Sequence, residues 1–249
     1  MQVTYISEPT PGGVNDDFVI AGERFVVVLD GATQLSESGC IHNVPWLVKR
    51  LGTQLATALV TEPDASLTSI LAGAIERVCA MHAGTCDLSN PSSPSSTVAL
   101  LRHGADTVDY LILCDSPVAI ETTDGKVQAI TDDATAYLPG YTQDDLRRTR
   151  NQPGGFWVAS TKPEAAEHAV VGSLNASEVH RVALMTDGMS RLVERYEWSW
   201  SRLMDVAESE GPAAAVRAVR EAEHATAPGT FRGKQYDDAT IAVCREFTS

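Results

Sequence analysis

The sequence predicts an α+β protein in which helices cover sheets of mostly antiparallel strands. Strand-like apolar segments follow one another between residues 97 and 130 with only short, turn-rich connections, and connections of this length join antiparallel strands. Helical segments with apolar residues at a 3.6-residue period lie outside that run. Because a doubly wound parallel sheet needs regular alternation of strands and helices, that architecture is excluded.

The predicted strands are short segments rich in β-branched and aliphatic residues. In chain order they cover residues 18–20, 24–29, 97–101, 108–114, 118–120, 127–130, 181–185 and 240–244. The Asp124-Gly125 dipeptide lies between two of them, where a hairpin needs a tight turn. We therefore expect Asp124 to have a structural role and no chemistry.

The predicted helices form two blocks. Apolar residues fall on one face over 44–59 and again over 67–78, with Asp64 or Ser66 available as N-cap of the second segment. A further helix is expected over about 191–208, and Pro212 in a first-turn position opens another. The first two helices are expected to form a hairpin.

Composition narrows the class of protein. The chain has 249 residues, with 19 Lys and Arg against 33 Asp and Glu, a net charge of −14. This charge disfavours binding to nucleic acids and to anionic membranes, because both need basic surfaces. Since there is no linker, apolar span or leader-like start, we expect one domain over 1–249 in a cytoplasmic protein, with its five cysteines reduced. The oligomeric state stays open.

Aspartates stand at the ends of the predicted strands. They are Asp16 and Asp17, Asp30 before Gly31, Asp115, Asp187 before Gly188, and Asp237 with Asp238. Asp-Gly is a common turn dipeptide, so each pair alone has a plain structural explanation. Carboxylates that converge repel one another unless cations lie between them, and oxygen ligands of this kind suit Mg²⁺ or Mn²⁺. Together the strand ends predict a divalent-metal site.

The same motifs, in this order, resemble those of the metal-dependent protein phosphatases of type 2C, the PPM family, in a divergent bacterial-like form. They are Asn15-Asp16-Asp17, Asp30-Gly31, Ser95-Ser96-Thr97, Asp115-Ser116, Asp187-Gly188 and Asp237-Asp238. The resemblance covers nearly the whole chain. It implies a four-layer α-β-β-α sandwich, in which two central antiparallel sheets are flanked by antiparallel helices.

The resemblance also implies a role for each aspartate. Asp30 bridges two metal ions, and the Gly31 carbonyl binds the second. Asp187 and Asp237 hold the first ion, while Asp16 and Asp17 support the second directly or through water. Asp238 lies behind the ligands, and Asp115 belongs to a third, weaker site. The implied cofactor is two Mn²⁺ or Mg²⁺ ions, with a third in some relatives. The catalytic residues Asp30, Asp187 and Asp237 thus act through a water held by the metals.

The implied activity is hydrolysis of phosphomonoesters, with Ser/Thr phosphoproteins as the first choice of substrate. Two alternatives stay open: a phosphatase for a small phosphorylated metabolite, and a metal-binding regulatory scaffold with weak catalysis. They stay open because Gly12 stands where the family carries a phosphate-gripping Arg. The residues that bind phosphate are therefore unknown, with Arg147, Arg148, Arg150, Arg191, Arg232 and Lys234 as candidate replacements.

Two further segments depart from the family. Ala32, Thr33 and Gln34 replace the Met-Gly or His-Gly continuation, so no histidine is available there as general acid. Residues 150–160 do not match the usual flap and substrate loop. Phe156 and Trp157 within them are expected to pack on the core rather than line a substrate pocket.

Cysteine and histidine residues offer a different metal hypothesis. Cys79, His82 and Cys86 fall on one face of an extended helix, and Cys40 and His42 lie elsewhere in the chain. Zinc could bind such a set, but the close Cys-x₂-Cys pairs of structural zinc motifs are absent. Free cysteine is also a common small core residue, so we expect no zinc here.

Overall fold

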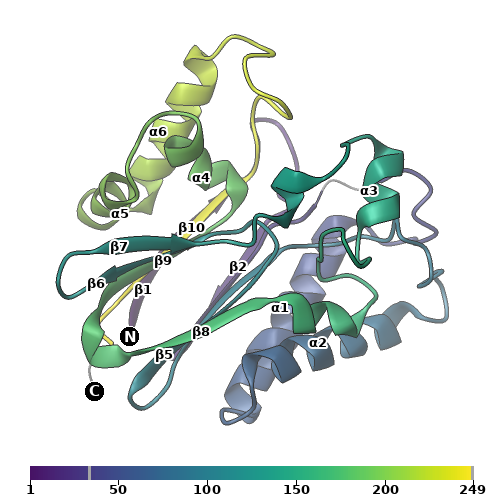
Figure 1. Cartoon of the computed structure of the whole chain (residues 1–249), viewed down its shortest axis with the longest axis horizontal. Coiled ribbons are helices and arrows are strands. Elements are labelled where there is room, and N and C mark those ends of the chain that lie inside the picture. Colours follow the sequence, from purple (N-terminus) through teal and green to yellow (C-terminus); the bar gives the residue numbers. More distant parts are fainter. Residues whose placement is uncertain (33–34, 248–249) are drawn as a thin grey trace.

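The computed structural model describes residues 1–32 and 35–247, and within them two five-stranded antiparallel sheets lie face to face (Figure 1). In spatial order the first sheet holds β1 (Gln2–Glu8), β10 (Ala239–Arg245), β9 (Val179–Met185), β6 (Val118–Thr122) and β7 (Val127–Ile130). The second holds β2 (Phe18–Ala21), β3 (Phe25–Leu29), β4 (Val98–His103), β5 (Thr107–Leu113) and β8 (Val170–Asn175). The predicted antiparallel pairing is confirmed.

Helices cover both outer faces of the sandwich (Figure 1). α1 (Val44–Thr61) and α2 (Leu67–His82) pack on the second sheet. α4 (Asp187–Glu194), α5 (Trp200–Ser209) and α6 (Pro212–Ala225) pack on the first. Ser66 caps α2, because its side chain accepts from the Ser69 N–H. The four-layer α-β-β-α fold is confirmed, and no helix of the described residues is long and apolar enough to cross a membrane.

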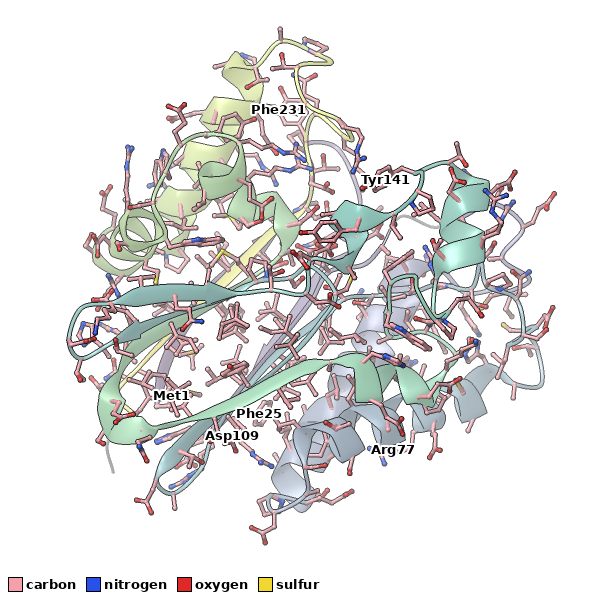
Figure 2. All side chains as sticks on the ribbon, viewed as in Figure 1. Met1, Phe25, Arg77, Asp109, Tyr141 and Phe231 are labelled. Carbon is pink, nitrogen blue, oxygen red and sulfur yellow. The ribbon has the colours of Figure 1, made fainter. Side chains whose placement is uncertain are left out.

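Side chains of β3 show why this strand has an uninterrupted apolar sequence. Val26 and Val28 pack between the two sheets, whereas Val27 and Leu29 face α1 and α2. Both faces of the strand are therefore buried, so it lacks the polar alternation of a strand that is exposed on one side. Figure 2 shows side chains filling the space between the sheets.

The expected helix over 191–208 is wrong in its extent, because the chain forms α4 and α5 instead. Glu197 between them has a φ of 58°, a left-handed conformation that ends the helical path. Ser199 then caps α5 by accepting from the Arg202 N–H. The break lets the two helices pack against the sheet in different directions.

Three elements have no counterpart in the sequence prediction: β1, β8 and α3 (Gln143–Thr149). β1 and β8 are edge strands with many exposed residues, and α3 buries no residue. α3 lacks the apolar periodicity from which helices are predicted. β1 does contain the strand formers Val3, Thr4, Tyr5 and Ile6, a signal that the prediction missed.

Candidate metal centre

Asp30 and Asp187 are brought together by the ends of two strands from different sheets. Asp30 follows β3, and Asp187 begins α4 directly after β9. The backbone N–H of Asp187 donates to a carboxylate oxygen of Asp30 at 3.3 Å. Both side chains keep partial solvent exposure, so an ion and its ligands can reach them.

The glycines that follow these aspartates permit close backbone approach. A Cβ on Gly188 would lie 1.9 Å from the carbonyl oxygen of Asp238, and a Cβ on Gly31 would lie 2.3 Å from that of Asp16. Real Cβ atoms do not approach oxygen so closely. The two Asp-Gly pairs therefore join strand ends to neighbouring segments, whereas Asp124-Gly125 forms the expected hairpin turn between β6 and β7.

Asp17 lies deeper than its neighbours, with only 6% of its surface exposed. One of its carboxylate oxygens accepts from the hydroxyls of Thr186, at 2.9 Å, and Thr240, at 2.7 Å. These threonines stand at the end of β9 and within β10. Asp17 thus connects the start of the second sheet to two strands of the first.

The carboxylate of Asp238 is hydrogen-bonded to backbone N–H groups. Its two oxygens accept from the N–H of Thr10, at 2.6 Å, and of Asp16, at 2.7 Å. These bonds fix the segment that contains Gly12, which is exposed and has a φ of +76°. An Arg at that position would be strained, so this loop differs in backbone shape as well as in sequence from one suited to Arg.

The electrostatics of the cluster favour bound cations. Burial among protein atoms, with the charge of Asp187 as the next cause, holds the pKa of Asp30 well above its ordinary value. Burial raises the pKa of Asp17 to about 8, although hydrogen bonds from Thr240 and Thr186 act to lower it. Burial and the charge of Asp237 raise the pKa of Asp187 to about 6. An all-oxygen donor set with this excess of negative charge fits Mg²⁺ or Mn²⁺.

Asp16 and Asp115 lie at the margin of this cluster. Burial and the charge of Asp238 raise the pKa of Asp16. Asp115 follows Cys114, whose φ of 70° bends the chain at the end of β5. Its carboxylate accepts from the Thr135 hydroxyl at 3.0 Å, and its charge contributes to the raised pKa of Asp30. All the acidic positions predicted from the sequence therefore interact with the same centre.

Asp237 differs from the other aspartates because cations already contact both of its oxygens. Arg191 lies 2.6 Å from one oxygen and Lys234 lies 3.1 Å from the other. Arg191 is also paired with the fully buried Glu223 at 2.8 Å, which fixes its position. The Lys234 side chain is half exposed, so it is free to leave Asp237 when another cation or an anion arrives.

The remaining candidate cations lie elsewhere. Arg147 donates to Ser36 and Ser92, and Arg150 donates to the carbonyls of Pro91 and Ser93. Arg148 pairs with Asp145 on α3. The guanidinium of Arg232 lies 3.3 Å from the ring centre of Tyr141. Of the six candidates, Arg191 and Lys234 are the ones that the structure pairs with a carboxylate of the centre.

Several hydroxyl side chains that support the centre have roles that sequence reasoning missed. Ser96 donates to the Asp30 carbonyl at 2.9 Å, and the Thr97 hydroxyl accepts from the Asp30 N–H at 3.3 Å. Thr186 had not been singled out. Its signal was a hydroxyl residue directly before an aspartate at a strand end, whereas Thr240 lies two residues after Asp238 and has no equivalent signal.

Two segments depart from the family pattern, residues 150–160 and residues 32–34. Phe156 is 5% exposed and packs with Cys114 and Val158, while Trp157 stacks on His168 with ring centres 3.7 Å apart. Their expected packing on the core is confirmed. Ala32 is described, but Thr33 and Gln34 lie outside the described residues.

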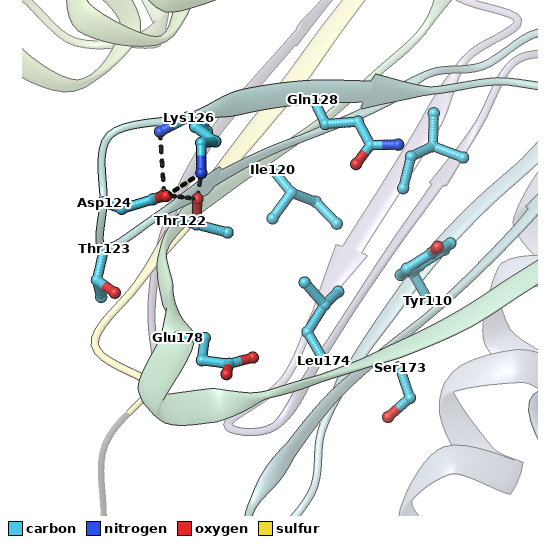
Figure 3. Close-up of a pocket in the computed structure, with 11 residues that line it drawn as sticks. Tyr110, Ile120, Thr122, Thr123, Asp124, Lys126, Gln128, Ser173, Leu174 and Glu178 are labelled. Carbon is cyan, nitrogen blue, oxygen red and sulfur yellow. Dashed lines mark hydrogen bonds and ion pairs between the residues drawn. The ribbon is translucent and has the colours of Figure 1, made fainter.

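A cavity of about 510 Å³ lies away from the carboxylates, between the β6–β7 hairpin and β5 and β8 (Figure 3). Its lining includes Tyr110, Lys126 and Glu178, and none of the strand-end aspartates. Asp124 in its wall is bonded to Thr122 and Lys126, both within the hairpin. The cavity therefore belongs to a different part of the molecule from the carboxylate centre.

Comparison with known structures supports the fold. A serine-threonine phosphatase of the PPM type from Mycobacterium smegmatis, MsPP, in complex with cacodylate, matches with a TM-score of 0.61, 18% identity and coverage of 98% of this chain and 97% of that one. The catalytic domain of the serine/threonine phosphatase PstP, in complex with two manganese ions, matches with a TM-score of 0.61 and 16% identity, and the match covers 97% of this chain and 96% of that one. The serine/threonine phosphatase Stp1 from Staphylococcus aureus matches with a TM-score of 0.67 and 12% identity, and the match covers 99% of this chain and 95% of that one.

Sequence comparison places the chain in a family. No protein with a curated description matches it. The profile of protein phosphatase 2C matches residues 12–221, which include most of the strand-end aspartates. On the strength of this match and the shared sandwich, the chain belongs to the protein phosphatase 2C family.

Proposed function

We propose that this protein is a Mn²⁺- or Mg²⁺-dependent phosphomonoester hydrolase that acts on Ser/Thr phosphoproteins. The observation that carries the proposal is the convergence of Asp17, Asp30 and Asp187, whose pKa values are all raised. Carboxylates that lie this close together repel one another, and bound cations would remove that repulsion, so the cluster is well suited to bind cations. Family membership supports the same conclusion.

The proposed ligands are Asp30, Asp187, Asp237 and the Gly31 carbonyl, with Asp16 and Asp17 at the second ion and Asp115 at a third. Bound divalent ions would neutralise the phosphate and activate water as the nucleophile. Asp17, held by two threonines, and Asp238, held by two backbone N–H groups, would fix the geometry of the ligands. We also propose that residues 1–249 form one catalytic domain, since both sheets share one apolar layer.

Lys234 is our proposal for the cation that grips phosphate in place of the missing arginine. Its amino group lies 3.1 Å from Asp237 and its side chain is half exposed. A lysine offers a point charge without the paired donors of arginine, so its hold on phosphate is less directional. This difference favours a small phosphorylated metabolite as the alternative substrate, with a weakly catalytic scaffold as the remaining alternative.

An activity assay separates these functions. p-Nitrophenyl phosphate and a phosphothreonine peptide are incubated with wild-type protein, with and without Mn²⁺, and with Asp187→Asn. Hydrolysis of both substrates that needs Mn²⁺ and is lost in Asp187→Asn supports the proposal. Activity that persists in EDTA contradicts it. Hydrolysis of the ester but not the peptide indicates the metabolite phosphatase, and no turnover by folded protein indicates the scaffold.

A further inference from the structure

Three metal-ligating side chains meet at the end of α2, apart from the strand-end aspartates. This thiol–imidazole cluster consists of Cys40, His82 and Cys86, whose ligand atoms all lie within 4.8 Å of one another. The Cys40 sulfur lies 3.6 Å from His82 Nδ1 and 3.0 Å from the Cys86 sulfur. His82 is buried, at 3% exposure, while both cysteines keep partial exposure.

The cluster forms where α2 ends and the chain changes direction. α2 stops at His82, and the next turn returns the chain so that the Cys86 N–H donates to the His82 carbonyl at 3.0 Å. Cys40 comes from the segment that precedes α1. Cys79, one helical turn before His82, instead has its sulfur 3.9 Å from the Ser160 carbonyl. The set on one helix face that the sequence suggested is therefore not the set that meets in space.

We propose that Cys40, His82 and Cys86 bind one Zn²⁺ ion, independently of the carboxylate centre. Tetrahedral zinc with ordinary bond lengths separates a sulfur and a nitrogen ligand by about 3.6 Å and two sulfurs by about 3.8 Å. The first value equals the Cys40–His82 distance. The two sulfurs would move apart by somewhat less than 1 Å on binding, which their partial exposure allows.

A fourth ligand is within reach. The His42 and His82 rings meet edge to face with centres 5.8 Å apart, and His42 also stacks on Trp46 with ring centres 3.9 Å apart. Rotation of His42 away from Trp46 would complete a Cys₂His₂ set, which is common in structural zinc sites. The proposed fourth ligand is therefore His42.

The two thiols of the cluster differ before a metal binds, because burial, with the hydrogen bond to Cys86 as the next cause, raises the pKa of Cys40 to about 11. Burial acts to raise the pKa of the Cys86 thiol, but hydrogen bonds from Cys40, Thr85 and the backbone of residues 41 and 42 lower it overall. Burial and the neighbouring His42 lower the pKa of His82, so this ring is neutral and able to accept a metal. Zinc binding needs the thiolate and the neutral imidazole.

Bound zinc would reinforce a connection that two hydrogen bonds already make, from the Asp87 N–H to the Gly39 carbonyl at 2.9 Å and from the Asn90 amide to the Glu37 carbonyl at 2.8 Å. Residues 35–43 lead from the carboxylate centre to α1, and none of them belongs to a helix or strand. The ion would attach this segment to the end of α2. Its role would thus be to stabilise the connection that follows Gly31.

Cobalt spectroscopy tests the proposal because it reports thiolate ligands specifically. Reduced, metal-free wild-type protein is titrated with Co²⁺ and then with Zn²⁺. A thiolate-to-cobalt charge-transfer band should appear, reach an intensity that corresponds to about one thiolate-bound Co²⁺ per chain, and disappear when Zn²⁺ displaces it. Cobalt held by carboxylates gives no such band, so the carboxylate centre does not contribute.

Matched variants complete the experiment. In an Asp30→Asn background, which disables the carboxylate centre, Cys40→Ser and Cys86→Ser should lose the band and the rise in melting temperature that Zn²⁺ gives, while Cys79→Ser should keep both. Circular dichroism checks that each variant is folded, and Cys86→Ser, at a partly exposed position outside α2, is the variant least dependent on packing. Asp30→Asn should also keep the band. A reduced and folded wild type without the band overturns the proposal, as does a band that survives undiminished in both serine variants.

Discussion

The two ends of β9 carry acidic clusters of opposite character. Near its start, Arg181 pairs with Glu121, Asp205 and Glu208 at 2.5 to 2.7 Å, and Arg245 pairs with Glu208 at 2.8 Å. Just beyond its end, Asp187 meets Asp30 and other carboxylates with fewer cations than anions. At the first end two arginines face three acidic residues, whereas at the second Arg191 and Lys234 face seven aspartates and both pair with Asp237.

This difference appears in the protonation of single residues. Although burial acts to raise it, hydrogen bonds from Arg245 and Arg181 hold the pKa of Glu208 below its ordinary value. At the other end of the strand, burial raises the pKa of Asp17 to about 8. Arginines lower the pKa of an acidic residue in the first cluster, whereas the pKa of Asp17 in the second is raised, as we expect of a cation site. A functional acidic site is therefore recognised by missing compensation rather than by its count of carboxylates.

The largest expected effect is loss of activity in Asp30→Asn. Hydrolysis of p-nitrophenyl phosphate with Mn²⁺ should fall at least about 100-fold, because even residues behind metal ligands contribute 10- to 100-fold. In EDTA the variant should melt at the same temperature as wild type or higher, since one repelling charge is gone. Asp124→Asn, in the β6–β7 turn, is the control and should keep full activity. Equal activity of the two variants would refute the assignment.

Arg181→Met should lower stability and leave activity unchanged, which is the reverse of the effect expected for Asp30→Asn. It leaves Glu121 and Glu208 with less compensation, so the free energy of unfolding in urea should fall by about 2 kcal/mol. The specific activity of the folded protein should not change. The exposed Arg217→Met on α6 serves as control and should unfold like wild type. A loss of activity without a loss of stability would mean that the two ends of β9 do not differ as described.

Lys234→Ala tests whether Lys234 binds the phosphate group of the substrate at the carboxylate centre. KM for p-nitrophenyl phosphate should rise about tenfold, which corresponds to about 1.4 kcal/mol for a lost charged hydrogen bond, with little change in kcat. Lys126→Ala, beside the cavity of Figure 3, should leave KM unchanged. A lower KM in Lys234→Ala would instead show that Lys234 competes with metal or substrate for the centre.

The pH dependence of stability without metal gives the smallest effect. Because the pKa of Asp17 is raised to about 8 in the fold, the folded state holds a proton that the unfolded state lacks, and stability rises as pH falls. Between pH 8 and pH 7 in EDTA, wild type should gain about 1 kcal/mol relative to Asp17→Asn. Urea unfolding at the two pH values measures this. The absence of any difference between the two proteins would contradict the raised pKa.

Local signals in the sequence predicted antiparallel strands covered by helices and the aspartates at the strand ends, whereas the four-layer sandwich followed from the resemblance to the family. Leu29 ends a continuous apolar strand, and Asp30 follows it, so the position was readable without the structure. The helix α3, which buries no residue, had no such signal. The ion pairs of Asp237 with Arg191 and Lys234, and the approach of Cys40 to Cys86, depend on segments distant in sequence. Spacing along the chain contains no information about such contacts.

The central claim is that the aspartates at the strand ends form a divalent-metal centre, and isothermal titration of metal-free protein with Mn²⁺ tests it most directly. Wild type should bind about two ions per chain at pH 7 and release protons, because the raised pKa of Asp17 keeps a proton that the metal displaces. Asp30→Asn should lose this binding and Asp124→Asn should keep it. Equal binding of Mn²⁺ by wild type and Asp30→Asn, or no binding by folded wild type, would contradict the claim.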